Sequence, residues 1–218
     1  MIASTYKGLF LKAFIGLLLL SITSIALYSY HILNKQHFAK ARTLHIKEGT
    51  SLTGVVRQLY ENNIVNDPLT TRILLQGLGF QRKLRAGVYD ITPGETLLKL
   101  INKISEGKEK LFSFTIVEGH NFKELIKNIE STQSISSEDI LDLSEHELNA
   151  ALGIEVSSPE GLFFPDTYHY PWGTTAFSLL RLSKEKMEEI IKVEWRDRSP
   201  NLAFSSKYEA LVLASIIE

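Results

Sequence analysis

The sequence predicts an α+β protein with a single transmembrane helix at its N-terminus. Three observations support this fold class. Residues 13–34 contain no Asp, Glu, Lys or Arg, short segments of alternating apolar residues precede amphipathic segments in the rest of the chain, and 218 residues are enough to bury a substantial core. We therefore divide the chain into a tail at 1–12, a membrane helix at 13–34, a small βααβ module at 43–110 and a mainly helical α+β region at 111–218.

The apolar segment 13–34 is long enough to cross a bilayer. A helix rises ~1.5 Å per residue, so the segment covers a hydrocarbon core of ~30 Å. Tyr28, Tyr30 and His31 lie near its C-terminal end, where amphipathic rings suit the interface. A cleaved signal peptide and a buried helix of a soluble protein are the alternatives. The sequence disfavours both, because it shows no small-x-small cleavage site and no polar helix face.

The charges that flank the apolar segment leave its orientation open. Two lysines, Lys7 and Lys12, precede it, and four basic residues follow it closely. These are Lys35, Lys40, Arg42 and Lys47. Counting Lys and Arg alone would place the body in the cytoplasm, but a long C-terminal domain can be exported despite such charges.

The composition excludes several classes of function. The chain has 24 Lys and Arg against 25 Asp and Glu, all of the acidic residues lie after residue 34, and the body has no block of like charge. A protein that binds nucleic acid through electrostatics is therefore not expected. The absence of Cys excludes disulfides, thiolate zinc sites and Cys nucleophiles, and the six His show no metal-ligand spacing. We expect no metal site.

The body contains an internal repeat of a short strand, a Gly turn and an amphipathic helix. The three copies begin with Ile46-Lys-Glu-Gly49, Ile91-Thr-Pro-Gly94 and Ile116-Val-Glu-Gly119. Each Gly would provide the positive φ that such a turn requires. We expect helix caps just after the turns. The candidate caps are Thr50 or Ser51, Thr96 and Asn121.

Residues 43–91 read as strand, helix, helix, strand. The first helix is expected over Leu52–Tyr60, Asp67-Pro68 opens the second, and Arg85–Ile91 forms the returning strand. This order resembles a LysM-type module, a small fold often used to grip glycan chains. A spacer domain without a ligand is the alternative, and the sequence leaves both interpretations open.

The last part of the chain is predicted to be mainly helical. Ser144 and Glu147 form a capping box that opens a short helix, residues 157–173 are expected to be irregular, and a long helix follows over 175–195. A second capping box at Ser206 opens an apolar helix that reaches Glu218. No Gly cap, basic last turn or Pro follows that helix, so we expect these residues to be the N-terminal part of a longer, truncated chain.

The first candidate site is Glu160–Tyr168, with the sequence Glu-Gly-Leu-Phe-Phe-Pro-Asp-Thr-Tyr. Gly and Pro-Asp favour a tight loop, and the aromatic side chains would form a wall for a sugar ring. We predict substrate contacts from Glu160, Phe164, Asp166 and Tyr168. The alternative is an ordinary turn with hydrophobic contacts.

The second candidate is Glu218, as a general acid and base. Its helical spacing places it on one face with Leu211, Ala214 and Ser215. A carboxyl group beside small and apolar neighbours loses hydration, so its pKa rises and it can remain protonated near neutral pH. General acid catalysis of glycosidic cleavage requires this property. A solvated helix residue is the alternative.

The two candidate segments together resemble the YceG-like (MltG) family of endolytic murein transglycosylases. Glu160–Tyr168 is similar to the family's E-G-hydrophobic-aromatic-P-D-T-aromatic signature, and Ala214-Ser-Ile-Ile-Glu218 to its A-S-I-[IV]-E catalytic helix. One membrane helix, a LysM-like module and a catalytic region follow in the family's order. The resemblance covers essentially the whole chain, and the two motifs in this order make it specific.

The resemblance implies a bacterial lyase held in the inner membrane by one helix, with residues 1–12 in the cytoplasm and the body in the periplasm. Such enzymes cut the β-1,4 bond between MurNAc and GlcNAc in nascent peptidoglycan strands, leave 1,6-anhydroMurNAc ends and terminate strand elongation. No metal or organic cofactor is implied. Peptidoglycan strands and the cytoplasmic membrane are the implied partners, and peptidoglycan synthases are candidates.

The family helix continues A-S-I-I-E-K-E-T, with two glutamates two residues apart, whereas this sequence ends at the first of them. The sequence leaves open whether Glu218 or the second glutamate is the acid. We therefore expect the 218-residue polypeptide to lack transglycosylase activity and its full-length parent to be active. A membrane-anchored scaffold that binds peptidoglycan without chemistry of its own is the alternative function.

Overall fold

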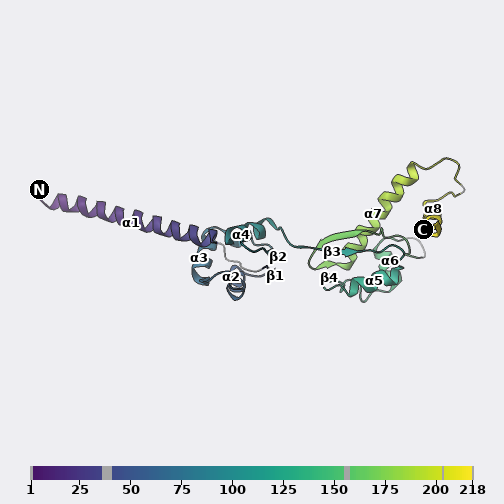
Figure 1. The fold of residues 1–218 in the computed structure, drawn as a ribbon, viewed down its shortest axis with the longest axis horizontal. Helices are drawn as coiled ribbons and strands as arrows, with labels where there is room; N and C mark the ends of the chain where they lie inside the picture. The colour runs from purple at the N-terminus through teal and green to yellow at the C-terminus, as the bar shows by residue number, and fades with distance from the viewer. Residues whose placement is uncertain (1, 36–40, 155–157, 203, 218) are drawn as a thin grey trace. The chain divides into compact units, whose positions relative to one another are not determined.

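A computed structural model of the chain describes residues 2–35, 41–154, 158–202 and 204–217. It contains both helices and strands, in agreement with the predicted α+β class. The chain divides into two compact units, residues 1–110 and 111–218, and each is described by itself (Figure 1).

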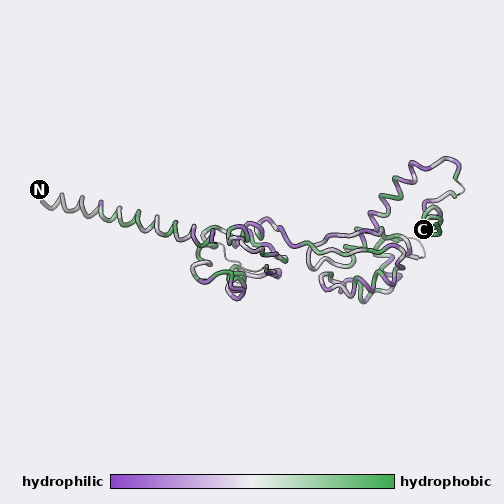
Figure 2. The backbone as a smooth tube through the Cα atoms, in the orientation of Figure 1, coloured by the Kyte–Doolittle hydropathy of each residue, from purple (hydrophilic) through white to green (hydrophobic). Residues whose placement is uncertain are grey.

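The first unit begins with the long helix α1, Ile2–Asn34. Within it, Lys12–Asn34 is long and apolar enough to cross a membrane. The described part of this helix is mostly green to white in Figure 2, without a hydrophilic stripe along it. Near its C-terminal end, Ile32 and Leu33 pack against the core of the module that follows. The predicted apolar N-terminal helix is confirmed.

The module after α1 has the predicted order of strand, helix, helix and strand. Its elements are β1 Arg42–Ile46, α2 Leu52–Glu61, α3 Pro68–Gly77, the 3₁₀ turn η1 Phe80–Arg82, β2 Gly87–Ile91 and α4 Leu97–Glu106. Strands β1 and β2 pair antiparallel with Leu44 opposite Tyr89. Apolar side chains from these elements form one core whose largest fully buried members include Tyr89, Phe80, Leu44, Leu59, Leu75 and Leu100. The likeness to a LysM module remains a prediction.

Side-chain caps begin the helices where the sequence predicts them. In each case the side-chain oxygen of the N-cap residue accepts a hydrogen bond from a backbone N–H of the first turn. These N-cap residues are Ser51, Asp67, Thr96, Asn121 and Ser144. Thr50, the alternative to Ser51, instead donates to the carbonyl of Lys47. The three repeat glycines adopt φ of 74°, 77° and 74° at Gly49, Gly94 and Gly119.

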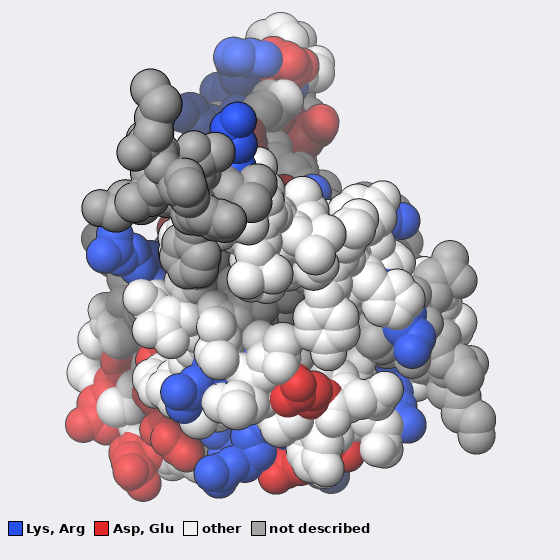
Figure 3. Space-filling model, turned by 90° about the vertical axis from the view of Figure 1, so that its left-hand side faces the viewer, with Lys and Arg blue, Asp and Glu red and all other residues white. Residues whose placement is uncertain are grey.

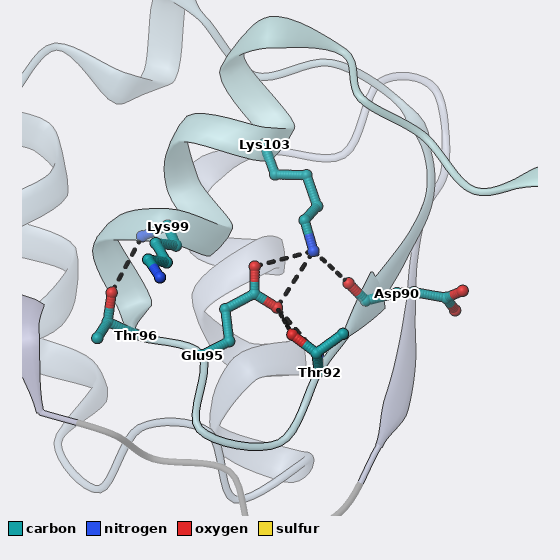
Figure 4. A network of polar contacts seen from close by, with 6 residues as sticks. All are labelled: Asp90, Thr92, Glu95, Thr96, Lys99 and Lys103. Atoms are coloured by element: carbon teal, nitrogen blue, oxygen red, sulfur yellow. Dashed lines mark hydrogen bonds and ion pairs between the residues drawn. The ribbon is translucent and has the colours of Figure 1, made fainter.

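A buried carboxylate ties the turn after β2 to helix α4. Glu95 is 7% exposed and accepts hydrogen bonds from the backbone N–H and the hydroxyl of Thr92, at 2.9 and 3.1 Å (Figure 4). The Nζ atom of Lys103 on α4, eight residues after Glu95, lies 2.8 Å from the other carboxylate oxygen and also donates to the Asp90 carbonyl at 2.6 Å. Burial raises the pKa of Glu95, but the hydrogen bonds from Lys103 and Thr92 outweigh it and leave the pKa below its usual value.

The second unit is built around a pairing of distant strands. Its elements are β3 Leu111–Thr115, α5 Phe122–Glu130, β4 Ile135–Ser136, α6 Glu145–Ala151, β5 Thr167–Pro171, β6 Thr174–Thr175, α7 Ala176–Arg196 and α8 Lys207–Ile217. Strands β3 and β5 pair antiparallel, and the short β4 and β6 pair parallel. The core includes Phe114, Ile129, Tyr168, Leu179 and Leu180. Helix α8 has no buried residue among those described.

The expectation that residues 157–173 are irregular is wrong over Thr167–Pro171, which form β5. Tyr168 and Tyr170 are buried, whereas Thr167, His169 and Pro171, which alternate with them, are exposed. This is the alternation of a half-buried strand. The Pro and Gly residues on both sides obscured it in the sequence, and its partner β3 lies more than 50 residues earlier. Residues 155–157 lie outside the part of the chain that the structure describes.

Glu95→Gln is expected to loosen the turn between β2 and α4. The substitution removes the ion pair with Lys103 and replaces one acceptor by an amide donor, which should cost about 1–2 kcal/mol of local stability. Hydrogen exchange of the amides in residues 92–103 measures this change. Because the folded-state pKa of Glu95 lies below its usual value of 4.5, its contribution is present above that pH and is lost as the pH falls through the lowered pKa.

Glu106→Gln is the matched control, since the ion pair of Glu106 with Lys108 is exposed to solvent. Exposed pairs contribute about 0.5 kcal/mol or less, so exchange should barely change. Equal effects of the two substitutions would show that the buried carboxylate has no special role.

Candidate functional site

The segment Glu160–Tyr168 forms a loop that closes on itself and runs into the first two residues of β5. The phenol of Tyr168 is buried and donates to the carbonyl of Phe164 at 2.7 Å. The N–H of Phe164 donates in turn to the carbonyl of Ser183 on α7 at 3.1 Å. Burial, followed by the nearby Asp166 carboxylate, raises the pKa of Tyr168 to about 12, so the phenol stays neutral. The loop is thereby attached to both the sheet and α7.

Glu160 connects the loop to helix α5. Its Oε2 atom accepts a hydrogen bond from the backbone N–H of Phe122, the first residue of α5, at 2.9 Å. A carboxylate at this place also interacts favourably with the positive end of the helix dipole. The ring of Phe122 stacks on Phe163 with centroids 5.4 Å apart. Glu160 therefore has a structural partner whether or not it also contacts a ligand.

Asp166 and Lys186 form an ion pair on the surface of the same loop. Lys186 reaches from α7 and lies over two aromatic rings, 5.2 Å from the centroid of Phe164 and 5.8 Å from that of Tyr168. The hydrogen bond from Lys186, together with that from the Thr167 N–H, lowers the pKa of Asp166. Phe164 is half-buried, so one cation, one carboxylate and one partly accessible ring meet at this place.

The loop also meets helix α8. Gly161 has φ +74°, and a Cβ atom built on it would lie 3.5 Å from Cδ2 of Leu211 on α8. A methyl group would fit this space, but the left-handed backbone favours Gly. The contact brings the two segments singled out in the sequence, 160–168 and 207–217, against each other. The sequence alone did not establish this contact.

Glu218 lies outside the described residues, so its environment and pKa are not described. Its predicted neighbours on α8 are visible: Leu211 is half-buried, and Ala214 and Ser215 are exposed. Ile216 and Ile217, just before it, are 74% and 77% exposed.

The family of the chain follows from its match to known sequences. The model of the YceG-like family matches residues 44–218, most of the chain. The chain belongs to the YceG-like family. Both segments that meet through Gly161 and Leu211 lie inside the matched region.

Solved structures include a YceG-like protein, lmo1499, from Listeria monocytogenes. It shares 18% identity with this chain at a TM-score of 0.37, and the match covers 72% of this chain and 57% of that one. The chain thus matches little more than half the length of this YceG-like structure. No curated protein matches the chain.

The structure brings together three of the four predicted substrate residues and adds a fourth group. Phe164, Asp166 and Tyr168 share contacts with Lys186, whereas Glu160 points to α5. Lys186 was not singled out from the sequence, because α7 carries several lysines among acidic residues and no sequence pattern distinguishes this one. Within the ranges that the structure describes, no group of three His, Asp or Glu could hold a metal ion.

Tyr168→Phe is expected to destabilise the second unit by about 1 kcal/mol, because the carbonyl of Phe164 loses its buried donor. Thermal unfolding measures the loss. The raised pKa predicts a second effect with a defined sign: the wild type loses stability as the pH rises from 10, the usual value, towards about 12, and the variant lacks this contribution to the loss.

Tyr60→Phe is the control, since Tyr60 is 50% exposed on α2. It should change neither the unfolding temperature nor its pH dependence. A Tyr168→Phe variant indistinguishable from Tyr60→Phe would contradict the role assigned to the phenol.

Proposed function

We propose that the protein is an endolytic peptidoglycan lytic transglycosylase, a lyase that cleaves MurNAc–GlcNAc β-1,4 bonds in nascent glycan strands. Membership of the YceG-like family supports this activity. The observation that carries the proposal is the approach of Leu211 on α8 to Gly161, since it brings the aromatic loop beside the helix that precedes Glu218 in the sequence. Neither segment alone would provide both a sugar-binding wall and an acid.

The proposed chemistry needs one carboxyl group at the end of α8. Glu218, or the glutamate two residues further in the family pattern, donates its proton to the glycosidic oxygen as the bond to C1 of MurNAc breaks. The resulting carboxylate accepts the proton of the MurNAc 6-hydroxyl, whose oxygen attacks C1. The products are a 1,6-anhydroMurNAc end and a free GlcNAc 4-hydroxyl, and no water is consumed.

The loop supplies the proposed binding groups. Phe164 offers a partly accessible ring for stacking against a sugar, and Asp166 and Lys186 offer an acceptor and a donor beside it. The buried Tyr168 supports the loop from within, and Glu160 fixes it to α5. We therefore assign direct glycan contact to Phe164 and Asp166, and assign Tyr168 and Glu160 to positioning.

The proposed location is the bacterial inner membrane. Helix α1 would cross it once with the N-terminus in the cytoplasm, and the two units would lie on the periplasmic side with their substrate. The alternative function is a membrane-anchored protein that only binds peptidoglycan through the module at 43–110. In this module two helices lie between β1 and β2 in the sequence, and the two strands pair antiparallel. This order resembles a LysM module, and that resemblance favours the alternative.

The test uses the complete gene product, including any residues that follow Glu218. Peptidoglycan glycan strands are incubated with the purified protein, and the products are identified by mass spectrometry. We expect 1,6-anhydroMurNAc ends, and at least about a hundredfold loss when the catalytic glutamate is changed. Glu218→Gln and the same change at any glutamate two residues further identify which of them is the acid.

Glu194→Gln is the matched control, because Glu194 is an exposed glutamate on α7. It should leave the rate of cleavage unchanged. Glycan binding by the complete protein without any anhydro product would refute the transglycosylase proposal and favour the scaffold.

A further inference from the structure

An apolar groove separates helix α1 from helix α3 in the first unit. It holds a volume of about 580 Å³ and is open to the outside. One wall is formed by Thr70, Ile73, Leu74 and Gly77, at helical spacing on α3, and by Leu78 just after it. Residues of α1 form the other: Ser24, Ile25, Tyr28 and Ser29. Every lining residue is uncharged.

The α3 wall is a second apolar face, distinct from the one that packs into the core. Thr71 and Leu75 are the buried residues of α3. Ile73 is 60% exposed and Leu78, just after the helix, is 51% exposed, and Leu69 beside them is 63% exposed. A helix of a soluble domain normally keeps one such face in the core and the other polar. The second face therefore needs a cover.

The position of the other wall identifies that cover. Ser24 to Ser29 belong to Lys12–Asn34, the part of α1 that can cross a membrane. They precede the end of this span by five to ten residues, and a helix rises ~1.5 Å per residue, so they lie roughly 8–15 Å inside it. With α1 across a membrane, a groove with this wall would open to lipid rather than to bulk water.

We propose that α3 lies in the interfacial layer of the membrane, with its apolar face covered by phospholipid. The module would then be docked on the bilayer instead of being held only by α1. This inference rests on α1 spanning the membrane and is independent of the transglycosylase activity.

The charges around α3 fit an anionic lipid surface. Between residues 64 and 88 there are four basic side chains and one acidic residue, Asp67. The basic residues are Arg72, Arg82, Lys83 and Arg85, and all four are exposed. Asp67 is already engaged as the N-cap of α3. The view in Figure 3 shows a broad area of uncharged side chains, with basic and acidic side chains both within it and around it. This pattern suits a helix at the boundary between acyl chains and anionic headgroups.

The absence of Cys allows a direct test with single labelled cysteines. In the complete gene product, an environment-sensitive fluorophore is attached to the cysteine of the variant Ile73→Cys, on the groove face of α3. The labelled protein is reconstituted into vesicles of phosphatidylethanolamine and phosphatidylglycerol. Arg57→Cys, an exposed position on α2 outside the groove, is the matched control, and Leu18→Cys reports whether α1 enters the bilayer. Spin-labelled phospholipid is the quencher.

We expect the label at 73 to be quenched at least about threefold more than the label at 57, and the label at 18 most strongly. Replacing phosphatidylglycerol by phosphatidylcholine should weaken quenching at 73 and leave quenching at 57 and 18 unchanged. Equal quenching at 73 and 57 with strong quenching at 18 would overturn the docking of α3. Weak quenching at 18 would overturn the membrane span on which the proposal rests.

Hydrogen exchange of the unsubstituted protein is the control for a label that disturbs folding. The amides of residues 68–78 should exchange more slowly in the vesicles than in detergent. Unchanged exchange over these residues would contradict the proposal without any substitution.

Discussion

The pairing of β3 with β5 determines the arrangement of the second unit. It joins residues more than 50 positions apart, with Phe114 opposite Tyr168 and a hydrogen bond between the hydroxyls of Thr115 and Thr167 at 2.9 Å. Tyr168 is at once a core residue of this sheet and the donor that closes the aromatic loop on Phe164. The loop can meet α5, α7 and α8 only because this strand holds its end in place.

Local features of the fold could be predicted from the sequence. The caps at Ser51, Asp67 and Thr96 and the turns at Gly49 and Gly94 depend on neighbouring residues, and the structure confirms them. The apolar N-terminal helix follows from composition alone. Long-range features could not be predicted in this way. The strand β5 needs a distant partner, and the contact of Gly161 with Leu211 requires the return of the chain after α7.

The same distinction applies to the candidate site. Motif resemblance selected 160–168 and the helix that precedes Glu218, and family membership is confirmed over residues 44–218. The individual roles need the contacts. Tyr168 and Glu160 have intramolecular partners, so their presence in the motif has a structural reason, whereas Phe164 and Asp166 remain accessible beside Lys186. Composition gave no reason to single out Lys186 or the apolar face of α3.

We propose that the aromatic loop and α8 form one glycan site. Hydrogen exchange of the complete gene product measures it most directly, with the candidate glutamates changed to Gln to prevent cleavage and with peptide-free glycan strands added. We expect residues 160–168 and 207–217 to become protected together and at the same glycan concentration. Protection confined to residues 43–110, with both of these segments unchanged, would contradict it.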